Sequence, residues 1–195
     1  MTSRVRKFGL TVHLIVSVGW VGAVAAFLLL ALSALTSDGP TSRAAYIAME
    51  VVGRGALLPL SVGALTSGIV QSLGTKWGLF KHYWVLVKLV LTVFATAALF
   101  LHQFTAVAEA ARLASQAVVS QTSVPLRQLG LQLRADAGLA LLVLVTITAI
   151  AVYKPWGLIG HVSRSLRLFL AAITALLVAF VALHLSGRSP HQHSH

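Results

Sequence analysis

The sequence has no cysteine, two methionines and only four acidic residues among its 195. The lack of cysteine excludes disulfides, thiolate metal sites and iron–sulfur clusters, and it leaves histidine as the best candidate for a metal ligand. The scarcity of methionine leaves few soft ligands for Cu(I). No glycine-rich phosphate loop and no Ser–His–acid set is present, so phosphate-loop and nucleophilic hydrolase chemistry find no support in the sequence.

The few acidic residues are far outnumbered by lysine and arginine, and the formal net charge is +11. In a soluble protein such a charge would suggest a nucleic-acid partner. Here 57% of the residues are hydrophobic, only 10% are charged, and the mean hydropathy is +0.88. Several apolar runs exceed the ~20 residues that cross a bilayer. These features predict a polytopic helical membrane protein whose basic loops meet anionic lipid, with no nucleic-acid partner.

The predicted fold is all-α: a four-helix transmembrane bundle within residues 1–155, a fifth transmembrane helix within 156–185, and a disordered, histidine-rich tail from 186 to 195. The four helices of the bundle are predicted at 9–35, 41–73, 80–102 and 133–153. The first is interpreted as a retained helix and not as a signal peptide.

Two further features of the bundle follow from the sequence. Pro59 predicts a kink or tilt in the second helix, and the polar region from Glu109 to Gln132 predicts a loop with helical parts lying on the membrane surface. The loop cations favour the side of the N-terminus, which predicts a cytoplasmic N-terminus and an external C-terminus.

One stretch, residues 74–101, organises the rest of the chain. It carries a band of side chains typical of a membrane–water boundary: Trp77, Phe80, His82, Tyr83 and Trp84. Lys88 follows inside an apolar helix, seven residues after Lys81, and is therefore ~10 Å deeper. A lysine at that depth costs ~2–3 kcal/mol unless it extends to the surface or finds a partner, so the partner of Lys88 is the main question that the sequence poses.

His13 is the second polar group expected at that depth, because it lies six residues past Lys7, or ~9 Å inside the boundary. Trp20 shares its helix face, and Gly19 and Gly22 would permit a close helix contact or a flat cofactor surface. An imidazole facing a bundle interior is the usual protein ligand of haem iron. The structural alternative is that His13 only hydrogen-bonds a serine or threonine of a neighbouring helix.

The remaining candidates lie toward the opposite boundary. Glu50 and Arg54 are four residues apart on one helix face, where they either pair with each other or offer Arg54 to a charged group of a ligand. His102 and His184 are predicted at that boundary as candidate metal ligands. The tail histidines could hold copper or zinc loosely.

The order of these residues resembles the HemJ-type protoporphyrinogen oxidases, a group of bacterial membrane proteins. The matching positions are His13, Trp20 and Gly22; Thr66, Ser67 and Gly68; Trp84 and Lys88; and Lys154 and Pro155. Part of the pattern is also similar to the copper-resistance D (CopD) membrane domains, namely Thr75-Lys76-Trp77-Gly78 and Leu86-Val87-Lys88-Leu89. The nearest likeness is to uncharacterised bacterial proteins of this layout.

The resemblance implies a haem-b protein of the bacterial plasma membrane, with His13 as an axial iron ligand and Lys88 as the catalytic basic partner near the iron or on a propionate. Trp20, Trp84 and Arg54 complete the predicted cofactor site. The implied function is electron transfer, or oxidation of a small substrate, with a quinone or a partner protein, in contact with membrane lipid. The alternatives are a copper-handling transport protein and a structural subunit of a larger complex; a homo-oligomer is also left open.

Overall fold

The computed structural model describes residues 2–74, 81–116, 124–156, 164–173 and 175. The chain divides into two units, Met1–Gly157 and Leu158–His195. The described part of the second unit is helical over 164–173. All the elements that position the candidate site belong to the first unit.

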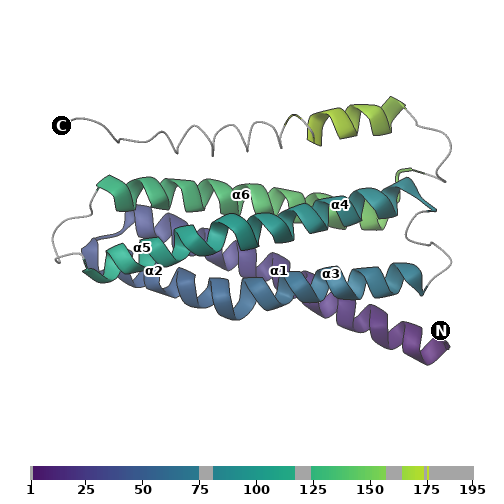
Figure 1. The fold of residues 1–195 in the computed structure, drawn as a ribbon, viewed down its shortest axis with the longest axis horizontal. Helices are drawn as coiled ribbons and strands as arrows, with labels where there is room; N and C mark the ends of the chain where they lie inside the picture. The colour runs from purple at the N-terminus through teal and green to yellow at the C-terminus, as the bar shows by residue number, and fades with distance from the viewer. Residues whose placement is uncertain (1, 75–80, 117–123, 157–163, 174, 176–195) are drawn as a thin grey trace. The chain divides into compact units, whose positions relative to one another are not determined.

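Four helical rods make up the first unit, and no strand occurs among the described residues. Their elements are α1 (Ser3–Thr36); α2 (Gly39–Val52), the π-helix η1 (Gly53–Leu57) and α3 (Leu58–Leu73); α4 (Tyr83–Ala98), the π-helix η2 (Leu99–Gln103) and α5 (Phe104–Gln116); and α6 (Val124–Tyr153). Figure 1 shows α3 continuing from α2, and α5 from α4. Each rod is long and apolar enough to cross a membrane, which confirms the prediction of an all-α, multi-pass protein with four such helices.

The predicted fifth transmembrane helix is not supported. Most of the segment predicted for it, together with the tail from 186 to 195, lies outside the described residues. The ten described helical residues at 164–173 are too few to cross a bilayer, which takes about 20. Four candidate spans are therefore found in the described part of the chain.

The turn predicted between the first two helices is present. α1 ends at Thr36, and α2 begins at Gly39 with Pro40 in its first turn, where a missing backbone N–H costs nothing. The backbone N–H of Ser42 donates to the Asp38 carbonyl at 2.8 Å. This short connection holds α1 and α2 as antiparallel neighbours.

The third and fourth rods extend well beyond the predicted helices, and this corrects the expected surface-lying loop between Glu109 and Gln132. α5 continues the third rod to Gln116, and α6 already begins at Val124. α5 packs against α2 and α6. Its buried side chains are small and recur at helical spacing: Ala106, Val107, Ala110, Ala111 and Ala114. The polar residues that suggested a surface loop occupy the other face of an amphipathic bundle helix.

A π-helical turn lies directly before Pro59, where a kink was predicted. Proline has no backbone N–H to donate to the carbonyl of Gly55, four residues earlier. The wider turn of η1, Gly53–Leu57, accommodates this loss without ending the rod.

The helices change neighbours along the bundle. One end of the bundle contains the starts of α1 and α4 and the ends of α3 and α6. There α1 and α4 each pack against α3 and α6, so α1 and α4 lie diagonally across a ring of four helices. We call this the Lys88 end. At the opposite end, called the Asp38 end, the ring consists of α1, α2, α5 and α6 (Figure 1).

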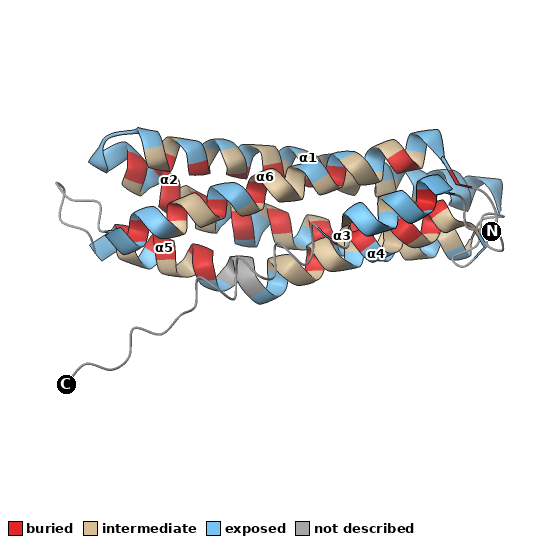
Figure 2. Ribbon diagram, turned by 90° about the horizontal axis from the view of Figure 1, so that it is seen from above, coloured by how far each residue is buried: buried red, intermediate tan, exposed pale blue. Residues whose placement is uncertain are grey.

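The core is concentrated toward the Asp38 end. All five buried residues of α1 lie from Trp20 onward, and α3 has none after Ala64 (Figure 2). Tyr46 of α2 is fully buried, donates a hydrogen bond to the Leu126 carbonyl at 3.3 Å, and packs against Gly130 of α6. The Lys88 end of α1 and α3 is thus packed more loosely than the rest of the bundle.

We expect Gly130→Ala to lower the free energy of unfolding by roughly 1–3 kcal/mol. The added methyl group would overlap the Tyr46 hydroxyl and come within 2.9 Å of the Leu35 side chain. Gly138→Ala is the matched control on the same helix, because nothing lies within 4 Å of its added methyl group. It should leave stability unchanged or raise it by up to about 1 kcal/mol. Denaturant unfolding in detergent, followed by circular dichroism, compares the two; equal stabilities would contradict this packing.

Candidate functional site

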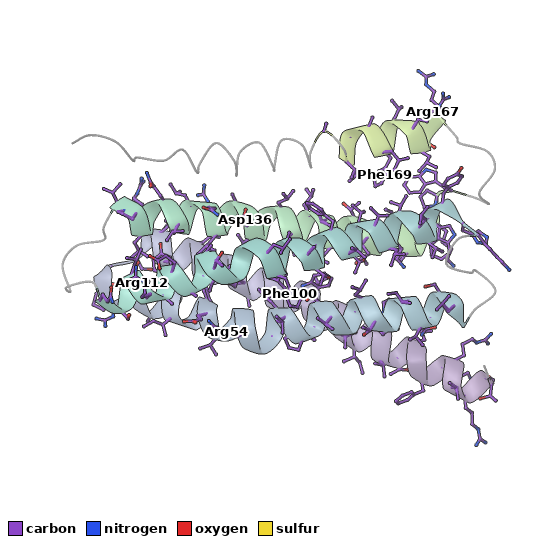
Figure 3. All side chains as sticks on the ribbon, in the orientation of Figure 1. Arg54, Phe100, Arg112, Asp136, Arg167 and Phe169 are labelled. Atoms are coloured by element: carbon purple, nitrogen blue, oxygen red, sulfur yellow. The ribbon has the colours of Figure 1, made fainter. Side chains whose placement is uncertain are left out.

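The Lys88 end of the bundle contains no carboxylate side chain. The four acidic residues of the chain are Asp38, Glu50, Glu109 and Asp136. Asp136 comes nearest along its own helix, and it still lies roughly 25 Å from the end of α6 at Tyr153. Arg54, Arg112 and Asp136 lie together in the other half of the bundle (Figure 3). The four acidic side chains of the chain therefore lie away from the Lys88 end.

His13 makes a hydrogen bond to the neighbouring helix. Its Nδ1 lies 2.9 Å from Oγ of Ser67 on α3. The Ser67 hydroxyl is also 2.5 Å from the Gly63 carbonyl oxygen. Two oxygens so close need a hydrogen between them, so Ser67 donates to Gly63 and accepts from Nδ1–H of His13. The imidazole is thereby fixed with its lone pair on Nε2.

That nitrogen remains accessible. Nε2 of His13 has no hydrogen bond to a described residue, and it is not among the fully buried side-chain atoms that lack a partner. The half-buried ring packs on Gly68, where an added Cβ would lie 3.3 Å from Cε1. The absence of a side chain at Gly68 lets the ring approach α3 closely, with Nδ1 bonded to Ser67.

Trp20, Gly19 and Gly22 of α1 lie in three different surroundings. Trp20 is buried and belongs to the hydrophobic core. Gly19 faces Leu60 of α3, whose Cδ2 would lie 3.2 Å from an added Cβ. Gly22 is exposed and faces nothing within 4 Å. Close helix contact is therefore made at Gly19, and the predicted flat surface at Gly22 is not part of the α1–α3 interface.

Lys88 lies at the same height as His13 and Ser67. Ser67 precedes the end of α3 by six residues, and Lys88 follows the start of α4 by five. Its ammonium is 5.5 Å from the ring centroid of Trp84, one turn earlier on the same helix. The structure therefore brings both predicted side chains to one level of the bundle.

Lys154 joins this group from α6. Its ammonium lies 5.9 Å from the same Trp84 ring centroid. Lys154 follows the last residue of α6 with a φ of 45°, and its backbone N–H donates to the Ile150 carbonyl at 3.0 Å. The end of α6 thus places a second cation on the indole that Lys88 already covers.

The other predicted site residues are not brought to this group. Arg54 pairs with Glu50 at 3.0 Å, with 63% of its side chain exposed, and stands about 20 Å along its rod from Ser67. His102 lies within η2, but its side chain falls outside the described residues, as does the whole of His184. Among the described residues, no group of three His, Cys, Asp or Glu side chains could hold a metal ion.

Sequence reasoning missed Ser67 as the partner of His13 and Lys154 as a neighbour of Trp84. Ser67 could have been found by counting residues inward from the membrane boundary, because the two antiparallel helices place it at the height of His13. The position of Lys154 had no such signal. Two buried polar atoms without a partner among the described residues, Nε2 of Gln71 and Oγ1 of Thr96, were also not singled out.

Comparison of the chain with family models, with curated proteins and with solved structures finds no match. The resemblance to the HemJ-type and CopD groups therefore stays a prediction, and the candidate site is argued from its own geometry.

We expect Ser67→Ala to destabilise the protein by about 1–2 kcal/mol, because it leaves Nδ1–H of His13 without an acceptor. Ser72→Ala is the control: on the same helix, its hydroxyl donates only to carbonyls of its own helix, Gly68 at 2.6 Å and Ile69 at 3.2 Å. That change should shift stability by less than about 0.5 kcal/mol. Thermal unfolding measures both, and nitrogen-15 spectra of the imidazole report whether Nδ1 carries the proton. A proton on Nε2 in the unchanged protein would contradict the assignment.

Proposed function

We propose that this chain is a haem-b redox protein of the bacterial plasma membrane, with His13 as an axial ligand of the iron. The observation that carries the proposal is the hydrogen bond from His13 to Ser67, which leaves an accessible lone pair on Nε2. Histidines that bind metals donate their other ring N–H to a neighbouring acceptor, which fixes both the tautomer and the ring orientation. The same bond serves the structural alternative, so the experiment below is designed to separate the two.

The charge around His13 supports an anionic cofactor. Haem b carries two carboxylates, and the Lys88 end offers ammonium groups without any carboxylate from the chain. Lys88, at the height of His13, is the basic partner for a propionate or for a group near the iron. The bound iron would supply one-electron chemistry. The residues of the chain hold and orient the ring, and the surrounding apolar helices limit access of water.

The position in the membrane follows from the distribution of polar residues. A helix of 34 residues is about 50 Å long, whereas the hydrocarbon core is about 30 Å thick. α5 is the least apolar part of the third rod, and the pairs Glu50–Arg54 and Glu109–Arg112 both lie toward the Asp38 end. We place the Lys88 end in the membrane with the N-terminus in the cytoplasm, and the Asp38 end projecting on the outer side. With the N-terminus in the cytoplasm, the external C-terminus predicted from the sequence requires the chain to cross the membrane a fifth time.

The copper-handling alternative has no supporting observation among the described residues. They contain no cluster of three metal-binding side chains, and Met49 is fully buried in the core toward the Asp38 end. The histidine-rich tail lies outside the described residues. The other alternative is that the chain is a structural subunit, in which His13 only bonds Ser67. This alternative predicts a colourless protein.

The protein purified from haem-replete cells should show a Soret band that His13→Ala removes. Ser67→Ala should weaken haem affinity by roughly 10- to 100-fold, because loss of the group that orients a ligand has effects of this size. Ser72→Ala is the matched control for Ser67→Ala, since the Ser72 hydroxyl bonds only carbonyls of its own helix. Absorption spectra during haem titration measure all three. A colourless preparation, or a band that His13→Ala leaves unchanged, would refute haem ligation by His13.

Single-cysteine variants test the orientation without background labelling, because the chain has no cysteine of its own. Arg127→Cys is exposed at the Asp38 end and should react with a membrane-impermeant maleimide added to intact cells. Arg4→Cys is exposed at the Lys88 end and should react only after the cells are permeabilised. The reverse pattern would place the N-terminus outside.

A further inference from the structure

Two of the four rods are interrupted by π-helical turns, and both turns lie at about one level of the bundle. η1 begins about 21 Å along the second rod from the Asp38 end, and η2 ends about 20 Å along the third rod from the same end. These two rods are neighbours there: α5 packs against η1, and an added Cβ at Gly53 would lie 4.0 Å from Cγ1 of Val107. By contrast, α1 and α6 are continuous over 34 and 30 residues.

The hydrogen-bond ladder is irregular at both π-helical turns. The backbone N–H of Leu58 reaches back five residues to the carbonyl of Gly53. The backbone N–H of Leu99 is shared between the carbonyls of Ala95 and Thr96. Helices bend at such turns. Beyond them, α3 and α4 pack against each other at the Lys88 end (Figure 1). The α3–α4 pair is therefore the part of the bundle that can move as a unit against the two continuous helices.

The packing of this pair is weaker on one side than on the other. α4, which packs against α3 and α6, has four buried side chains in this half: Trp84, Val85, Val87 and Leu91. α1 has no buried residue before Trp20, and α3 has none after Ala64 (Figure 2). We call the contact between α1 and α3 in this half the α1–α3 seam. It is the side on which the pair can separate from the bundle.

Small residues and a hydrogen bond make up the α1–α3 seam. Val16 lies against Gly63, and the ring of His13 lies against Gly68. The hydrogen bond between Nδ1 of His13 and Oγ of Ser67, at 2.9 Å, crosses the seam. Because contacts with glycine bury little apolar area, this hydrogen bond is a large share of what keeps the seam closed.

The two buried polar atoms that lack a partner in the described part of the chain both belong to the α3–α4 pair. They are Nε2 of Gln71 on α3 and Oγ1 of Thr96 on α4. Nε2 of Gln71 covers Gly9 of α1, where an added Cβ would lie 3.5 Å away. A buried polar group without a partner lowers the stability of the arrangement that buries it. Separation of the seam at Gln71 would let water or a lipid headgroup reach its amide.

We propose that the α3–α4 pair is a gate that moves on η1 and η2 and opens the α1–α3 seam, so that an amphiphilic ligand passes from the bilayer to the level of His13. The bond from His13 to Ser67 is its latch, and the unpaired amide of Gln71 favours opening. The gate is argued from packing alone and does not depend on the proposed function. Haem enters only in the last experiment.

The first experiment measures the movement by pulsed electron–electron resonance between spin labels on paired cysteines, since the chain has none of its own. Ile15→Cys and Val70→Cys place labels on exposed positions of α1 and α3 across the seam. Leu29→Cys and Val51→Cys are the matched control, because they join exposed positions of the same two rods in the other half. We expect two distance populations for the first pair and one for the control. A single population for both pairs would overturn the gate.

The second experiment tests the latch with the same labels. Ser67→Ala should raise the ratio of open to closed populations roughly tenfold, the effect of losing one hydrogen bond. Ser72→Ala should leave the ratio unchanged, because its hydroxyl bonds only carbonyls of its own helix. Gln71→Leu should lower the ratio, since it replaces the unpaired amide by an apolar group of similar size. Equal effects of the two serine changes would overturn the latch.

The third experiment closes the seam with a disulfide. An added Cβ at Gly63 would lie 3.6 Å from Cβ of Val16, within the range for a disulfide, so Val16→Cys and Gly63→Cys together can join the two helices. Haem uptake should be at least about tenfold slower in the oxidised form than in the same protein after reduction. Equal uptake in both forms would exclude entry through the seam. Binding in neither form would refute the proposed function, and the spin labels would then decide on the gate.

Discussion

The constraint on which this structure depends is the imbalance of charge between the two ends of its bundle. The four acidic side chains lie outside the Lys88 end, while Lys88 and Lys154 both approach Trp84 there. A cation within an apolar region is stable only if it is solvated, paired or extended to a surface. Since no acidic side chain lies at that end, solvation or extension to a surface is the route that the chain itself leaves to Lys88. The absence of acidic side chains distinguishes this end of the bundle more than any cavity does.

Toward the Asp38 end, cations are paired with acidic side chains of the chain itself. Glu50 pairs with Arg54 and Glu109 with Arg112 within single helices, and Tyr46 closes against Gly130 beneath them. Most of the hydrophobic core lies at this end, where four helices pack around small residues. A tightly packed half can hold the helices in register while the other half stays open to a ligand. Such a division suits a protein that binds something within the membrane, because the binding half need not supply the stability of the fold.

The apolar runs and the composition predicted the four helices that are long and apolar enough to cross a membrane, and the turn after Thr36 could be placed to within a few residues. The sequence also allowed the third helix to continue as an amphipathic extension, which α5 is. Its packing inside the bundle was not predicted, because Glu109, Arg112 and Gln116 look like a surface segment until the buried alanines on the opposite face have a partner helix. The contact of His13 with Ser67 was accessible in principle, since it requires only equal heights on antiparallel helices. The approach of Lys154 to Trp84 was not, because it depends on the left-handed turn that ends α6, a conformation that lysine does not signal.

The two halves of the candidate site place different demands on a ligand. Ser67 fixes the ring of His13 and leaves Nε2 as an acceptor, which a metal, a proton donor or water can satisfy. Lys88 and Lys154 contribute positive charge to the other half, which favours an acidic group of a ligand. A neutral ligand would meet only the first requirement and a simple anion only the second. A molecule with an acidic edge and an electron-accepting centre would meet both across the diagonal of the ring, provided that it spans from α1 to α4. The proposed haem, with its two carboxylates and its iron, is a molecule of this kind.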